Sequence, residues 1–89
     1  MRIEETTVAT IQGWKVTVAN ILPGKFRTPT GEQQGLTAVL GRYDQANRDQ
    51  GELTVGAGSE LTVAGQLWTV VAVVAGKGAE NGHVELATK

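Results

Sequence analysis

The feature that most constrains this chain is a short alternating pattern that occurs twice in close succession. The sequence Glu-Leu-Thr-Val-Gly at residues 52–56 returns as Glu-Leu-Thr-Val-Ala-Gly at residues 60–65, and a strongly apolar run begins just after it. Alternation of apolar and polar residues places every second side chain on one face of a strand, and glycine accepts the backbone angles of tight turns. The pattern therefore predicts a meandering antiparallel sheet.

The same kind of pattern extends over most of the chain and predicts about seven short strands. The expected strands are residues 3–11, 14–20, 36–43, 52–55, 60–63, 67–75 and 83–88. The sixth has apolar residues on both faces, which predicts a central strand buried at least in part on both sides. No stretch has apolar residues at helical spacing over three turns, so we expect little or no α-helix. The predicted fold is all-β, either a small antiparallel barrel or a two-sheet sandwich.

Length, charge and cysteine content bound the size and the partners of the protein. With 89 residues the chain can form one hydrophobic core, so we expect a single β domain over residues 1–89. The 8 basic side chains nearly balance the 9 acidic ones, which argues against a nucleic-acid partner because phosphate binding depends on clustered cations. The absence of cysteine excludes disulfides and thiolate metal sites.

No segment has the apolar character that export or membrane insertion requires. The first residues lack the apolar core of a signal peptide. The longest apolar run, residues 70–75, is much shorter than the roughly 20 residues of a membrane span. We therefore expect a cytoplasmic protein without a membrane partner.

The residues that could support catalysis are isolated in the sequence. His83 is the only histidine and has no partner at a metal-binding spacing, so we expect it to be a solvent-exposed strand residue. Glu52 and Glu60 hold equivalent places in the repeat and could face each other across a hairpin, but solvated charges at strand edges explain them more simply. The glycines of residues 56–59 complete no phosphate-binding motif. The sequence therefore predicts a protein that is not an enzyme and has no catalytic residue, cofactor or metal.

Residues 22–35 are the strongest candidate for a binding surface. Two prolines and several glycines in this segment predict a long irregular loop, and such loops in small domains often bind partners. Phe26 lies there between two cations, Lys25 and Arg27, and would suit an acidic or apolar partner. The alternative is a lid whose ring folds back to cap one open end of the barrel.

The other aromatic residues divide between the core and the surface. Trp14 and Trp68 stand in phase with valines on their own strands, which predicts core packing rather than a binding platform. Arg42 and Tyr43 form an exposed-looking pair at the end of a predicted strand. A cation beside an aromatic ring is the type of pair on which nucleic-acid bases stack.

The segment from residue 51 to residue 70 follows a recognisable order of elements. A Leu-Thr-Val-Gly strand and turn is followed by a short strand, a glycine bend and a closing strand that bears a tryptophan. In this order the segment resembles small actinobacterial β-domains of unknown function. The resemblance implies a standalone bacterial β-domain and supplies no catalytic residue.

These observations predict a non-enzymatic module that binds a protein partner. Binding would use residues 22–35 and an exposed strand edge, to which a partner can add a strand or dock an apolar side chain. The candidate contact residues are Lys25, Phe26, Arg27, Arg42 and Tyr43. Three alternatives stay open: a small immunity or antitoxin-type inhibitor, a structural component of a larger assembly, and an oligonucleotide-binding barrel. The sequence is also compatible with a homo-oligomer.

Overall fold

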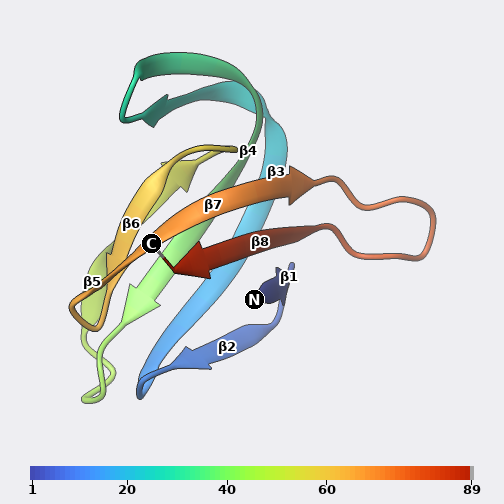
Figure 1. Cartoon of the computed structure of the whole chain (residues 1–89). Helices are drawn as coiled ribbons and strands as arrows, with labels where there is room; N and C mark the ends of the chain where they lie inside the picture. The colour runs from blue at the N-terminus through green and yellow to red at the C-terminus, as the bar shows by residue number, and fades with distance from the viewer. Residues whose placement is uncertain (89) are drawn as a thin grey trace.

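The protein consists of two four-stranded antiparallel sheets (Figure 1). One sheet has the order β1 (Arg2–Glu4), β8 (His83–Thr88), β7 (Gln66–Val74) and β6 (Glu60–Val63). The other has the order β2 (Val8–Ile11), β3 (Trp14–Thr28), β4 (Gly31–Tyr43) and β5 (Asp49–Val55). The computed structural model describes residues 1–88, and within them no helix is present that could cross a membrane. The all-β prediction is confirmed, with eight strands where about seven were expected.

The eight strands follow one another in chain order around a ring. The first and last strands, β1 and β8, are paired with each other. The two sheets are joined by corners between β1 and β2 and between β5 and β6 (residues 56–59). Backbone hydrogen bonds anchor both corners: Thr6 donates to the carbonyl of Val18, and Val70 donates to the carbonyl of Ser59. The strands on either side of each corner are not paired with each other. The molecule is therefore a sandwich whose sheets are joined at both edges into an incomplete barrel.

The hydrophobic core lies between the two sheets and follows the predicted alternation. The most completely buried aliphatic side chains come from both sheets and are Ile3, Val16, Leu40, Val63, Val70, Val84 and Leu86. Burial of a side chain of this size stabilises a fold by about 1.5–3 kcal/mol. Trp68 is buried with them, as predicted, and Trp14 is half-buried and packs against the core from its rim.

The first predicted strand is two strands in different sheets. Residues 3–11 were expected to be one strand, but β1 ends at Glu4 and β2 begins at Val8. Thr6, between them, has a positive φ of 62°, a conformation that turns the chain sharply. The corner allows both Ile3 and Ile11 to enter the core, each from a different sheet.

The segment predicted to be an irregular loop, residues 22–35, is instead a continuation of the β3–β4 hairpin. We call residues 22–36 the arm; in Figure 1 it curls over the top of the molecule, from cyan to green. The carbonyl of Arg27 accepts a hydrogen bond from Ser59, so the backbone N–H and carbonyl of Arg27 point away from β4. Positions four residues apart in a strand have the same orientation, so the backbone nitrogen of Pro23 also points away from β4. The N–H that proline lacks would therefore not have bonded to β4. Pro29 lies in the turn at the tip.

The prediction that the sixth strand is central is confirmed, but its two faces are buried to very different extents. β7 has neighbours on both edges, but only one of its faces is covered by the other sheet. Trp68 and Val70 point into the core, whereas Leu67 and Val71 are 40% and 54% exposed. A register shift between Val70 and Ala72 places Val71 outside the regular ladder.

The prediction for His83 is also wrong, because this side chain is only 8% exposed. Its Nε2 lies 3.6 Å from a carboxylate oxygen of Glu85 on the same strand. The preceding turn lies earlier in the chain than the Asn-Gly sequence indicated: Lys77 and Glu80 form an isolated bridge across it, and Gly78 has a positive φ of 63°.

Candidate functional site

The arm folds back onto the corner between β5 and β6 through one aromatic ring. Phe26 is 8% exposed, and its ring lies directly against the backbone of Gly56. A Cβ atom at Gly56 would lie 2.5 Å from Cγ and Cε1 of the ring, closer than real Cβ contacts. The ring also covers Gly35, where a Cβ atom would be 3.6 Å from Cε1. The prediction that Phe26 is an exposed anchor is therefore wrong, and the ring folds back as in the lid alternative.

A buried hydroxyl group fixes the arm to the same corner. Ser59 is 1% exposed, and its Oγ donates to the carbonyl of Arg27 (2.6 Å) and accepts from the N–H of Gly56 (3.0 Å). The corner is also tied to β7, because Gly58 donates to the carbonyl of Val70 (2.8 Å). Ser59 thus connects the arm, the corner and the second sheet.

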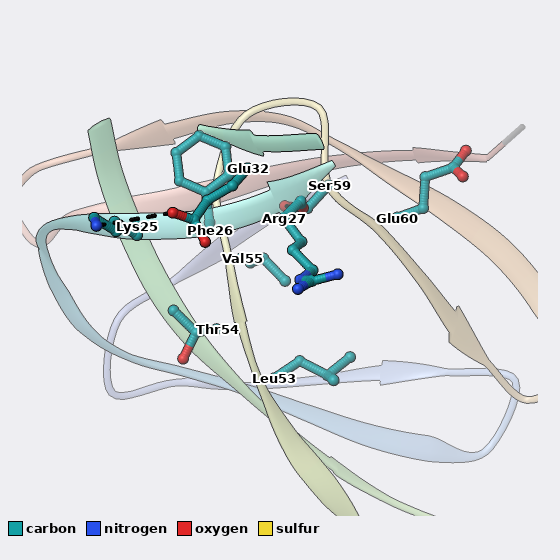
Figure 2. Close-up of a pocket in the computed structure, with 9 residues that line it drawn as sticks. All are labelled: Lys25, Phe26, Arg27, Glu32, Leu53, Thr54, Val55, Ser59 and Glu60. Atoms are coloured by element: carbon teal, nitrogen blue, oxygen red, sulfur yellow. Dashed lines mark hydrogen bonds and ion pairs between the residues drawn. The ribbon is translucent and has the colours of Figure 1, made fainter. Parts of the chain in front are cut away.

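An open cleft of about 410 Å³ lies between the arm and the two strands that flank the corner (Figure 2). We call it the arm cleft. Its lining residues come from the arm, from β5 and from the start of β6, and are Lys25, Phe26, Arg27, Glu32, Leu53, Thr54, Val55, Ser59 and Glu60. The arm cleft therefore lies where the ring of strands is interrupted between β5 and β6.

Arg27 is the cation that the arm cleft offers to a ligand. Its exposed side chain extends from the arm toward Leu53 and Val55 (Figure 2), and no carboxylate of residues 1–88 lies within 4.0 Å of its guanidinium group. Lys25 differs, because it forms an ion pair with Glu32 at 3.8 Å. The arrangement combines an accessible guanidinium group with apolar side chains on β5.

The structure divides the five predicted contact residues between two places. Lys25, Phe26 and Arg27 line the arm cleft together. Arg42 and Tyr43 lie outside it and are both half-buried. Three of the predicted residues therefore lie beside one cleft, and one of them, Phe26, forms its buried wall; their contact with a partner stays a prediction.

The Arg42 side chain crosses the gap between β5 and β6. Its Nη1 donates to the carbonyl of Thr62 on β6, and its Nη2 donates to the carbonyl of Gln50 on β5, both at 2.8 Å. Tyr43 packs beside Gly41 and is paired with Lys15 of β3. Arg42 thus has a role within the fold, because it holds the two sheets together.

Sequence reasoning missed the part of the cleft that comes from the repeat. Leu53 and Val55 belong to its first copy and Glu60 opens the second. The alternative in which Glu52 and Glu60 face each other across a hairpin is excluded, because β5 and β6 lie in different sheets and are not paired. The repeat itself was the sequence signal for this part of the cleft. Two similar strands joined by a short glycine-rich segment can lie in different sheets and meet at a corner, as well as pair in a hairpin.

No protein-family model matches the chain, and neither the curated proteins nor the solved structures that were compared give a match. The resemblance to small actinobacterial β-domains stays a prediction. The function is therefore inferred from the geometry of the arm cleft.

Proposed function

We propose that the protein is a non-enzymatic, cytoplasmic binding module that holds a segment of a partner protein in the arm cleft. The observation that supports this proposal is the Arg27 guanidinium group, which is accessible and lies beside the apolar side chains of Leu53 and Val55. Arginine is enriched among residues that dominate binding energy at interfaces, because it combines charge with a large flat surface.

The physical properties of the cleft suit a ligand that carries a carboxylate group next to an apolar group. A carboxylate can receive two parallel hydrogen bonds from one guanidinium group, which fixes its orientation. Apolar groups of the same ligand would contact Leu53, which is half-buried and lines the cleft. The volume of about 410 Å³ lies in the range of about 300–1,000 Å³ that is usual for binding pockets.

Selection from a library of displayed random peptides tests this proposal. Purified wild-type protein serves as the bait beside two variants, Arg27→Glu and Lys77→Glu. Lys77 is a matched control, because it is an exposed cation in the loop between β7 and β8. We expect the wild type and Lys77→Glu to enrich the same peptides and Arg27→Glu to lose them.

Two results would contradict the proposal. One is the absence of any enriched peptide with the wild-type bait. The other is the equal enrichment of the same peptides by Arg27→Glu, which would place binding elsewhere on the molecule. Circular dichroism spectra of all three baits establish that they share the same fold.

A further inference from the structure

Both strands that border the arm cleft leave one backbone edge unpaired. Over residues 1–88, β5 is hydrogen-bonded only to β4, and β6 only to β7. These two edges face the interruption in the ring of strands. The Arg42 guanidinium group occupies one carbonyl on each edge, those of Gln50 and Thr62, whereas Thr54 of β5 lies nearer the corner and lines the arm cleft. An unpaired strand edge can accept an extended segment of another chain through main-chain hydrogen bonds.

The backbone groups available on β5 follow from its contact with the corner. The N–H of Gly56 points away from β4, because it donates to Ser59 Oγ. Orientation alternates along a strand, so Thr54, two residues earlier, also directs its N–H and carbonyl away from β4. Thr54 lines the arm cleft. The edge of β5 therefore offers a donor and an acceptor there.

The groups available on β6 follow from its hairpin with β7. Val63 and Gln66 close a two-residue turn in which Ala64 and Gly65 have φ angles of 52° and 80°. The residues that close such a turn are hydrogen-bonded to each other, so Thr62 directs its backbone groups outward. The hydrogen bond from Arg42 to the Thr62 carbonyl agrees with this orientation and already engages that carbonyl, so an added strand would pair with β5.

The side chains around the cleft define what an added strand would carry. Successive residues of a strand point to opposite faces, and residues two apart lie about 6.4–6.8 Å from each other on the same face. One inward-pointing residue would meet the Arg27 guanidinium group and the next would meet Leu53. In Figure 2 the Glu60 carboxylate points away from Arg27, so it leaves that cation accessible.

We infer that the arm cleft accepts an extended peptide as a β-strand added to the edge of β5, with an acidic side chain against Arg27 and an aliphatic one two residues away against Leu53. This inference rests on the proposed function and specifies the chemistry of the partner. The evidence for it is the charge of Arg27 together with the outward backbone groups of Thr54 on β5.

A synthetic peptide tests the inference directly. The probe is the fluorescein-labelled heptapeptide Thr-Val-Thr-Glu-Thr-Val-Thr with blocked ends, which places valine on both sides of glutamate and so suits either strand direction. Its binding is followed by fluorescence anisotropy. We expect saturable binding that weakens by about tenfold or more in the Arg27→Glu protein or when glutamine replaces the glutamate of the peptide. Lys77→Glu should bind as the wild type does.

Methylation of alternate backbone amides of the same peptide distinguishes strand addition from contact through side chains alone. It removes main-chain donors and leaves the side chains unchanged, so an added strand should lose about tenfold or more in affinity. Equal affinity of the methylated peptide, or no saturable binding of the probe up to about 1 mM, would overturn the inference. Arg27→Gln serves as the second variant if charge reversal disturbs the fold.

The two levels of the hypothesis fail in different ways. If the displayed library yields peptides that bind the cleft but carry no acidic residue, the binding function stands and this inference falls. If the protein instead forms dimers with rising concentration in light scattering, and these dimers exclude the probe, the occupant is a second copy of the chain. That result would also overturn the inference.

Discussion

Replacement of Gly56 by alanine should destabilise the protein through a single steric contact. The new Cβ atom would lie 2.5 Å from Cγ and Cε1 of Phe26, so the ring or the corner must shift. Overpacking of this kind costs about 1–3 kcal/mol. The loss of glycine flexibility in the unfolded chain offsets about 0.4–1 kcal/mol, because Gly56 does not have a positive φ. The midpoints of these two ranges give an expected net loss of about 1.3 kcal/mol.

The assay is urea or thermal unfolding followed by tryptophan fluorescence. For a domain of this size, a loss of about 1.3 kcal/mol lowers the melting temperature by roughly 5–10 °C. Gly24→Ala is a matched control on the same arm, because its Cβ atom would lie at an ordinary 3.5 Å from Thr37 and Gly24 also lacks a positive φ. We expect that control to be neutral or slightly stabilising.

A double-mutant cycle identifies the cause. In a Phe26→Ala background the ring is absent, so Gly56→Ala should lose its cost and become neutral or slightly stabilising. An equal destabilisation in both backgrounds would refute the reasoning, because the cost could not then come from the contact between the ring and the corner.

Three other substitutions test further contacts. Ser59→Ala leaves the Gly56 N–H and the Arg27 carbonyl without their partner and should cost about 1–3 kcal/mol in urea unfolding; unchanged stability would contradict the role of the hydroxyl group. Arg42→Lys should cost about 1 kcal/mol, because one ammonium group cannot reach both carbonyls that the guanidinium group holds, and an identical unfolding midpoint would show that the link is dispensable. The hydrogen bond from the Arg48 backbone lowers the pKa of Asp44, against the opposing effect of burial. This contribution to stability is therefore present above the ordinary carboxyl pKa and is lost as pH falls through the lowered value; Asp44→Asn should show a weaker acid dependence of stability, and parallel pH profiles would contradict this.

The alternation of residue types was sufficient to predict most strands. The expected strands at residues 60–63 and 83–88 correspond to β6 and β8 without change. Polar and apolar residues alternate throughout β6 and from His83 to Leu86 in β8, which is the pattern of a strand. The alternation failed for β7, because apolar residues on both faces resemble a fully buried strand even when one face is exposed.

The arm shows why composition misled the prediction. Prolines and glycines usually interrupt strands, and the sequence does not reveal which backbone N–H groups a neighbouring strand will use. Pro23 is tolerated because its position points away from β4, and that orientation becomes clear only from the contact between Arg27 and Ser59. Phe26 looked exposed for the same reason, because its partner Gly56 lies on a different strand pair.

By itself, the sequence determined that the chain forms short antiparallel strands around one core, because a period of two is a local property that each segment carries independently. Only the tertiary structure decided that residues 25–32 meet residues 53–60 to form the arm cleft. That contact depends on the curvature of a long hairpin and on a corner where two sheets separate, and neither is encoded in the pattern of any single segment. For the same physical reason, the sequence showed Arg27 as one of two cations beside Phe26, whereas the fold engaged Lys25 with Glu32 and left Arg27 accessible in the cleft.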